Sequence, residues 1–163
     1  MKILISAAAA AMALASAPAL AHAETTVYGS IGYANIDVDP VTLGAIQGRL
    51  GGQINEHFAV EGEFSIGVAD DDVLGTSVEL NKEFGLFAVG ILPVSDTVSL
   101  NARVGWVDAE LNIGGTTDSS DGTAYGVGAQ VNFSPRDGIR LDYTRYELDS
   151  SADVWSLAYV RKF

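Results

Sequence analysis

Few side chains in this sequence could carry out acid–base or nucleophilic chemistry. There is no cysteine, and the two histidines are His22 and His57. Glu61 and Glu63 are two positions apart in FAVEGEFSIG, so an extended backbone places both carboxyl groups on one face, where they could act as an acid–base pair. No second histidine and no metal-ligand spacing accompanies His57 in the segment that follows Glu24. We therefore expect no catalytic site, no cofactor and no defined metal site.

Six charged residues share a different feature, because side-chain alternation assigns all of them to the polar face of their segments. In IQGRLGGQI, for example, Ile46, Leu50 and Ile54 lie on one face and Arg49 lies on the other. The six residues are Arg49, Glu61, Glu63, Arg103, Arg140 and Asp142. If these faces line the inside of a narrow closed sheet, the charges should pair, since an unpaired buried charge is heavily penalised. We interpret the six residues as a structural ion-pair network.

The elements that must position these residues are strands. Segments of about ten residues alternate apolar with small or polar side chains and are separated by turn-rich clusters. The pattern predicts eight strands, at 26–36, 42–54, 58–68, 78–92, 98–111, 123–133, 139–148 and 153–163. Short turns alternate with longer polar connections, which fall at 37–41, 69–77, 112–122 and 149–152. This arrangement is typical of an eight-stranded antiparallel up-and-down β-barrel.

Charge and aromatic placement indicate that the apolar face of this all-β barrel meets lipid. A basic residue on that face costs about 2–4 kcal/mol at the bilayer midplane and about 0–1 kcal/mol near the interface. Arg145 and Arg161 are predicted to point outward, and both lie near strand ends. Outward aromatic residues form two girdles, with Tyr33, Trp106, Tyr125, Tyr143 and Trp155 toward the long connections and Phe58, Phe133 and Phe163 toward the short turns. A soluble lipocalin-like carrier with its apolar face inward is the alternative. Alternation does not fix the register of 78–92, because both faces of NKEFGLFAVGILP are apolar.

The two ends of the chain indicate an exported protein. Residues 1–23 combine Lys2, an alanine-rich apolar run and the small-residue site Ala21-His22-Ala23, which predicts a cleavable signal peptide. Residues 24–163 then form one barrel domain. No cysteines are present to staple it, so closure of the sheet must supply stability. The chain has 21 acidic and 9 basic residues, and its net charge of −12 disfavours a nucleic-acid partner.

The chain resembles the OmpA-like transmembrane β-barrels of Gram-negative outer membranes, in a form that consists of the barrel domain alone. The segments that carry the resemblance are VYGSIGYAN, FAVEGEFSIG, ILPVSDTVSLNARVGW, GVGAQVNFSP and IRLDYTRY, followed by the aromatic C-terminus. The resemblance implies a monomer in the outer membrane, in contact with lipid and lipopolysaccharide and with both termini in the periplasm. It also implies that the last strand is read by the outer-membrane insertion machinery through Leu157, Tyr159 and Phe163. Arg161 departs from the aromatic or aliphatic residue that the family commonly has there.

The expected function is non-enzymatic and concerns the cell envelope or its surface. An eight-stranded barrel has an interior just wide enough for side chains to fill, so the lumen is expected to be closed to solutes. The long connections are acidic and contain no Lys or Arg, and we expect weak divalent-cation binding at Asp70, Asp71 and Asp72 or simple solvation of these loops. A narrow pore and a surface adhesin are alternatives, and a lipid A-modifying barrel enzyme is a further one.

Overall fold

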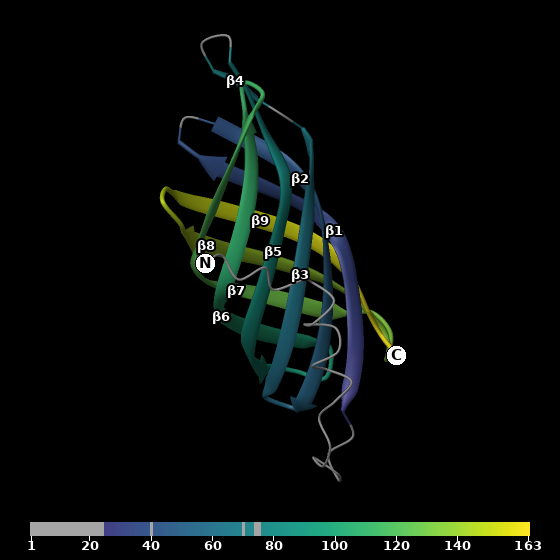
Figure 1. Cartoon of the computed structure of the whole chain (residues 1–163). Coiled ribbons are helices and arrows are strands. Elements are labelled where there is room, and N and C mark those ends of the chain that lie inside the picture. Colours follow the sequence, from purple (N-terminus) through teal and green to yellow (C-terminus); the bar gives the residue numbers. More distant parts are fainter. Residues whose placement is uncertain (1–24, 40, 70, 74–75) are drawn as a thin grey trace.

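The computed structural model describes residues 25–39, 41–69, 71–73 and 76–163, without the side chains of residues 41, 69, 71–73 and 76–79 (Figure 1). The predicted signal peptide at 1–23 lies outside the described residues. The strands are β1 (Thr26–Val38), β2 (Val41–Asn55), β3 (Phe58–Ala69), β4 (Asp71–Val73), β5 (Thr76–Pro93), β6 (Val98–Ile113), β7 (Thr116–Asn132), β8 (Asp137–Glu147) and β9 (Ser151–Lys162). No helix among the described residues is long and apolar enough to cross a membrane.

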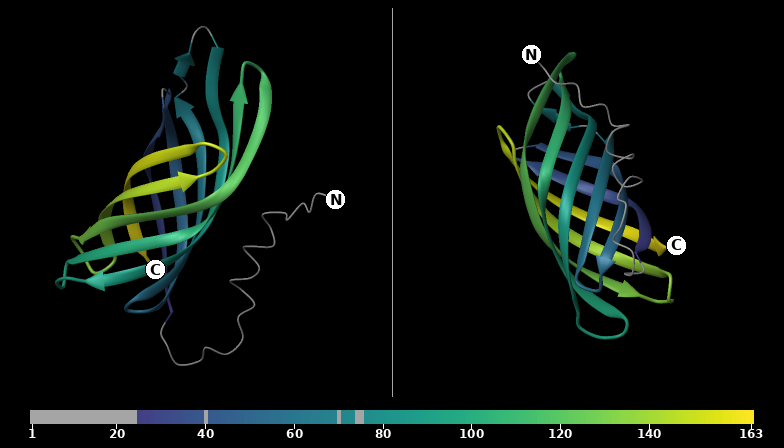
Figure 2. Two further views of the ribbon diagram at one scale, coloured as in Figure 1. Left: turned by 90° about the vertical axis from the view of Figure 1, so that its left-hand side faces the viewer. Right: turned by 60° about the horizontal axis from the view of Figure 1, so that its bottom comes forward.

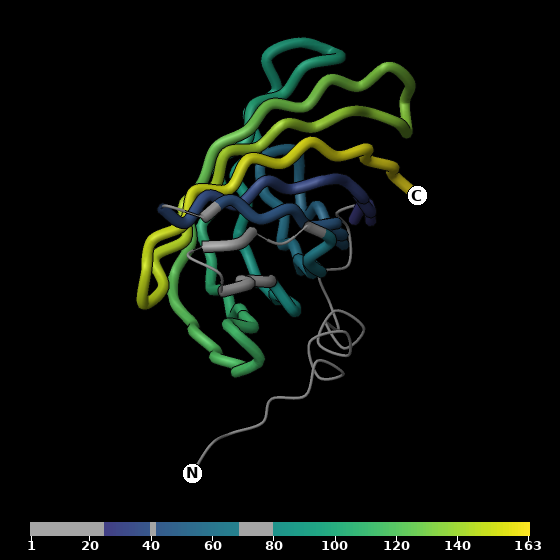
Figure 3. The backbone as a smooth tube through the Cα atoms, turned by 90° about the horizontal axis from the view of Figure 1, so that it is seen from above, coloured from purple at the N-terminus to yellow at the C-terminus, as the bar shows by residue number. Residues whose placement is uncertain are grey.

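The strands form one antiparallel sheet that closes on itself. The order is β3-β2-β1-β9-β8-β7-β6-β5-β4, and an additional pairing between β3 and β5 completes the ring. Figure 3 shows the first and last barrel strands, β1 and β9, side by side, and their register runs from Tyr28↔Lys162 to Asp37↔Asp153. The short strand β4 pairs only with β5 and lies outside the ring of eight. The predicted eight-stranded up-and-down barrel is therefore confirmed.

The two ends of the barrel differ in their connections. The end that carries Thr26, Lys162 and the turns at 56–57, 94–97 and 133–136 is called the terminal end. The opposite end, the distal end, carries the connections β1–β2, β3–β4–β5, β6–β7 and β8–β9. β5, β6 and β7, with 18, 16 and 17 residues, are longer than β8 and β9, with 11 and 12, so the β6–β7 hairpin, with β5 beside it, projects beyond β8 and β9 at the distal end (Figure 2).

The structure corrects two of the predicted connections. The segment 112–122 was expected to be a long polar loop, but it is paired strand except for Gly114 and Gly115. These glycines have φ values of 58° and 87°, the left-handed geometry of a two-residue hairpin turn. This hairpin lies beyond the part of the barrel where one strand face must be apolar. A polar sequence rich in Thr and Ser can therefore form paired strands there, although the same composition is also typical of a loop. The predicted loop 69–77 likewise contains β4.

Alternation along each strand separates an apolar outer surface from a mostly polar interior. On β8, Ile139 and Leu141 are 49% and 48% exposed, whereas Arg140 and Asp142 are 3% and 1% exposed. The expected outward aromatic residues are exposed, except that Tyr143 is half-buried against Trp155, with ring centroids 4.9 Å apart. A soluble carrier would have the opposite arrangement, with apolar side chains inward. The outer surface is thus the one that suits hydrocarbon.

The register of β5 shows why the sequence pattern failed there. The pairing with β6 shifts between Leu80 and Lys82, so the strand contains an irregularity at Asn81. Leu80 is buried before the shift, Lys82 is exposed after it, and Glu83 is again buried. A single extra residue exchanges the two faces of a strand. Glu83 therefore points into the barrel, a placement that no uniform alternation would assign together with Leu80.

Candidate functional site: the barrel lumen

Arg49 joins two acids that come from different sides of the lumen. Its Nε atom is 2.6 Å from Glu63 Oε2, and its Nη1 atom pairs with Asp142 Oδ2. Nη2 donates hydrogen bonds to Gln47 Oε1 at 2.7 Å and Ser156 Oγ at 3.0 Å. The side chains of Arg49, Glu63 and Asp142 are at most 2% exposed. One guanidinium group from β2 thus links β3, β8 and β9 through the interior.

Arg140 and Arg103 complete the network. Arg140 Nη1 donates to Glu61 Oε1, Nε lies 2.9 Å from Asp142 Oδ1, and Nη2 donates to Asn101 Oδ1 at 3.3 Å. Arg103 Nη1 is 2.7 Å from Glu63 Oε2, and Nη2 is 3.9 Å from Glu61 Oε2. The structure therefore brings all six residues of the expected network together.

A cation–π contact supports Arg103 from the other side. Its guanidinium carbon lies 3.6 Å from the centroid of the Phe87 ring, which is fully buried on β5. The ring can occupy this position because Gly105 is opposite Phe87 in the ladder. A Cβ atom at Gly105 would lie 2.0 Å from the Leu86 carbonyl oxygen and 2.8 Å from Phe87 Cα. Only glycine fits at this close approach.

Three lumen residues bonded to or packed beside the predicted acids were missed from the sequence. Tyr28 Oη donates to Glu61 Oε1 at 2.7 Å, and Tyr146 Oη donates to Glu63 Oε1 at 2.8 Å. Alternation could have identified Tyr146, because it is an even number of residues from the inward residues Arg140 and Asp142. Tyr28 is opposite Gly51, which lies on the inward face of β2, so it also points inward. The third is Glu83, whose placement depends on the shift in β5. No signal in the sequence located that shift.

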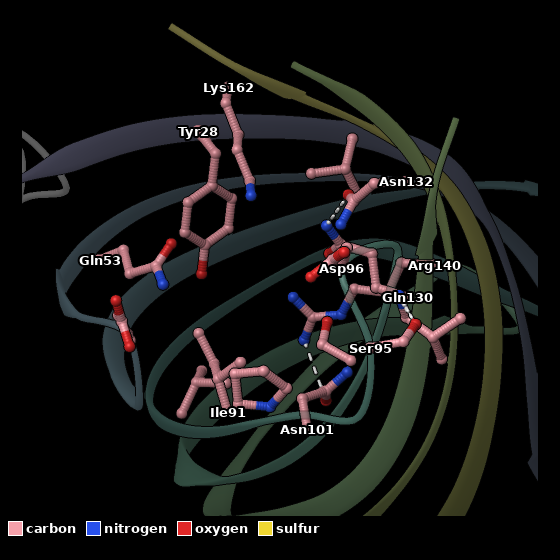
Figure 4. Close-up of a pocket in the computed structure, with 16 residues that line it drawn as sticks. Tyr28, Gln53, Ile91, Ser95, Asp96, Asn101, Gln130, Asn132, Arg140 and Lys162 are labelled. Atoms are coloured by element: carbon pink, nitrogen blue, oxygen red, sulfur yellow. Dashed lines mark hydrogen bonds between the residues drawn. The ribbon is translucent and has the colours of Figure 1, made fainter. Parts of the chain in front are cut away.

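The network separates two different halves of the lumen. On the distal side, the interior is apolar and includes Ile36, Leu43, Leu80, Val107 and Val154, each at most 7% exposed. On the terminal side, a cavity of about 360 Å³ is lined by both polar and apolar residues, and its polar ones include Tyr28, Asn101, Gln130, Asn132, Arg140 and Lys162 (Figure 4). Arg140 and Asn101 are bonded to each other at the inner limit of this cavity. The cavity thus meets the ion-pair network, and beyond the network the lumen is filled by apolar side chains.

The two acids considered for acid–base chemistry are buried in the network, and the described histidine lies in an exposed turn. Glu61 and Glu63, the possible acid–base pair, are at most 1% exposed and are engaged by arginines and tyrosines. His57 is exposed in the β2–β3 turn, where its backbone N–H donates to Asn55 Oδ1 at 2.8 Å. Among the described residues, no group of three or more His, Cys, Asp or Glu side chains could hold a metal ion. Asp70 and the side chains of Asp71 and Asp72, the expected cation loop, lie outside the described residues.

The three residues of the expected insertion signal share the outer face of β9 and its end. Leu157, Tyr159 and Phe163 are 55%, 41% and 73% exposed. The Phe163 N–H donates to the Val27 carbonyl at 2.9 Å, so the aromatic C-terminus is held against β1. Arg161, the departure from the family pattern, lies 3.0 Å from Asp137 Oδ1, which also accepts a hydrogen bond from Tyr159 Oη. The outward arginine is therefore paired with a carboxylate at the terminal end.

A closed barrel with an apolar exterior and a charged, filled interior defines a transmembrane β-barrel of the outer-membrane class. The chain belongs to the outer membrane protein beta-barrel domain family, whose model matches residues 7–163. This finding confirms the resemblance drawn from the sequence and identifies the outer membrane as the location of the barrel. No curated protein sequence matches the chain.

Several solved outer-membrane barrels share this fold. The attachment invasion locus protein Ail of Yersinia pestis, solved in complex with the heparin analogue sucrose octasulfate, aligns with a TM-score of 0.66 and 21% identity over 86% of this chain and 100% of that one. The N-terminal β-barrel domain of Pseudomonas aeruginosa OprF aligns with a TM-score of 0.64 and 9% identity, over 86% of this chain and 100% of that one. Neisserial surface protein A aligns with a TM-score of 0.55 and 19% identity, over 85% of this chain and 97% of that one. At these identities the likeness establishes the fold alone.

The central position of Arg49 leads to a testable prediction. Arg49→Leu leaves Glu63 and Asp142 without their shared partner, which should lower the free energy of unfolding by about 3–5 kcal/mol because two buried carboxylates lose compensation. The matched control is Arg161→Leu, which removes an outward ion pair that is half exposed and should change stability by at most about 1 kcal/mol. Urea unfolding in detergent, followed by the gel shift between folded and heated barrel, measures both. Equal stabilities for the two variants would contradict the structural role of the network.

Proposed function

We propose that this protein is a non-enzymatic outer-membrane barrel that does not conduct solutes and that acts through its distal end or as a structural part of the envelope. The observation that supports this proposal most strongly is the filled lumen, where the ion-pair network and the apolar layer of Ile36, Leu43, Val107 and Val154 occupy the interior. A pore requires a continuous polar path, and the apolar layer interrupts one. The buried, engaged acids argue in the same way against a lipid A-modifying enzyme.

We further propose that both termini face the periplasm and that the distal end faces the outside. All three terminal-end connections are short turns, whereas the β6–β7 hairpin extends the distal end, and outer-membrane barrels have short periplasmic turns and longer external connections. With this orientation Leu157, Tyr159 and Phe163 lie on the last strand in the position proposed for recognition by the insertion machinery. The outward aliphatic surface then contacts lipid and lipopolysaccharide, and the barrel is proposed to be a monomer.

Conductance tests the filled lumen directly. Purified protein reconstituted in a planar bilayer should produce no steady open-channel current, because no water-filled path crosses the apolar layer. A preparation that shows heat-modifiable migration on a gel, and is therefore folded, is required before the recording. A stable open-channel current from such a preparation, abolished by antibody or by boiling, would contradict a closed barrel.

A surface-interaction role is the second candidate, and the projecting hairpin favours it. Its sequence between Asp108 and Asp121 has four acids and no Lys or Arg. Ail was crystallised with a sulfated heparin analogue, but an acidic hairpin repels such polyanions. The ligand class that suits this chain is therefore a cationic surface, or an anionic one bridged by divalent cations, for which the Asp70, Asp71 and Asp72 connection remains the proposed weak site.

The strand register allows a hairpin deletion that leaves the barrel intact. Removing 111–113 and 116–118 keeps the Gly114-Gly115 turn and joins it to the existing Glu110↔Ser119 pair. The shortened barrel should fold, show unchanged heat-modifiable migration and lose cell adhesion if the hairpin binds a ligand. The matched control is the full-length Thr117→Ser variant. Adhesion that is unchanged, together with a weakened permeability barrier, would instead favour the structural role.

A further inference from the structure

Among the described residues, the buried side chains of the lumen include one carboxyl group more than they have cations. Its buried charged side chains are Arg49, Arg103 and Arg140 on one side and Glu61, Glu63, Glu83 and Asp142 on the other. Three guanidinium groups therefore face four carboxyl groups. Rearranging the pairs cannot change this count, so a fully ionised set would leave one negative charge uncompensated in a water-poor interior.

Glu83 is the carboxyl group that the network leaves out. Its residue is 1% exposed, and neither of its oxygens has a hydrogen-bond partner in the described part of the chain. The other three acids are satisfied: Glu61 by Arg140 and Tyr28, Glu63 by Arg49, Arg103 and Tyr146, and Asp142 by Arg49 and Arg140. Glu83 thus has the burial of the network without its compensation.

The position of Glu83 explains why no arginine reaches it. In the ladder, Glu83 is opposite Ser65 on β3 and Ala109 on β6. Gly85, two residues nearer the terminal end on the same strand, is opposite Glu63. Polar or charged groups that act on it are Glu63 and Ser65 of β3, Arg103 of β6 and Tyr146 of β8. Glu63 repels its negative form, and Arg103, the only cation among these four, has its Nη1 atom 2.7 Å from Glu63. Glu83 therefore lies at the boundary between the network and the apolar layer.

We propose that Glu83 is a proton-binding site of the barrel lumen and is a neutral carboxylic acid at neutral pH. The bound proton is the fourth positive charge that the buried set needs. The resulting Glu83 O–H can donate a hydrogen bond to the neighbouring Glu63 carboxylate or Ser65 hydroxyl. Buried carboxyl groups without a cation neutralise in this way, because charging them in an apolar environment is far more costly than holding a proton.

A proton bound at Glu83 makes the stability of the barrel depend on pH. At neutral pH the folded barrel holds a proton on Glu83 that the unfolded chain, with its solvated glutamate, has released. At this site the folded state then binds one proton more than the unfolded state, so the contribution of Glu83 to stability falls as pH rises above about 4.3, the ordinary pKa of a solvated glutamate. The contribution of one proton corresponds to a change of up to tenfold in the unfolding equilibrium constant per pH unit, until Glu83 ionises in the folded state.

Infrared spectroscopy and unfolding of Glu83→Gln test this site together. The folded wild-type barrel at neutral pH should show the carbonyl stretch of a protonated carboxyl group, which is lost in Glu83→Gln and retained in the control Glu110→Gln, whose partly exposed carboxylate pairs with Lys82. Glu83→Gln should have an unfolding constant within about threefold of wild type near pH 4, where the wild-type chain holds the proton in both states and the amide has the shape of the neutral acid. At neutral pH the variant should unfold less readily than wild type, because its unfolded chain has no proton to release, and the linked pH dependence should be lost.

Three results would overturn the proposal. The first is the absence of a protonated-carboxyl band in wild-type protein, a measurement that needs no variant and decides the question even if Glu83→Gln does not fold. The second is a Glu83→Gln barrel whose unfolding constant rises more than a hundredfold at neutral pH, which would indicate an ionised and paired Glu83. The third is a wild-type stability that depends on sodium or potassium and not on pH, which would assign a metal ion to the fourth charge.

Discussion

The structure depends on one constraint, which is that backbone N–H and C=O groups in hydrocarbon must all be paired within the protein. A sheet can satisfy this condition only by closing, and here the pairing of β3 with β5 closes the ring of eight strands. Closure at eight strands leaves an interior that side chains alone must fill. The outer face is then free to be apolar and the inner face to be polar, so the arrangement of nearly every side chain in the barrel follows from this closure.

The interior satisfies its charges collectively. Ion pairs removed from water contribute little net stability unless their remaining hydrogen-bonding groups are also satisfied, and Arg49 shows how this is achieved, with two carboxylates, an amide and a hydroxyl around one guanidinium group. The tyrosines Tyr28 and Tyr146 serve Glu61 and Glu63 in the same way. The network therefore links strands β2, β3, β6 and β8 across the lumen. Its hydrogen bonds and ion pairs are directional, whereas contacts between aliphatic side chains are not.

The sequence predicted the barrel and the membership of its network because period-2 alternation in a sheet with one apolar face leaves little freedom. Arg49, Arg103 and Arg140 could be assigned inward from neighbouring residues alone. Glu83 could not, since the shift between Leu80 and Lys82 reverses the two faces and nothing in NKEFGLF marks it. The segment 112–122 was misjudged for a related reason, because polarity distinguishes a loop from a strand only where one face is buried, and most of this hairpin is exposed on both. The roles proposed for Leu157, Tyr159 and Phe163 and for Asp70, Asp71 and Asp72 concern partners, which neither alternation nor geometry can identify.

The most direct test of this account is to ask which methyl groups touch lipid. In nanodiscs, nuclear Overhauser effects should connect lipid acyl chains with the methyl groups of Val104, Val127 and Leu141, which are 59%, 59% and 48% exposed. Val89, Val107 and Val160, which are at most 2% exposed, should show none, although Val107 is only three residues from Val104 on the same strand. Acyl-chain contacts at the second set, with water contacts at the first, would contradict the assignment of the two faces.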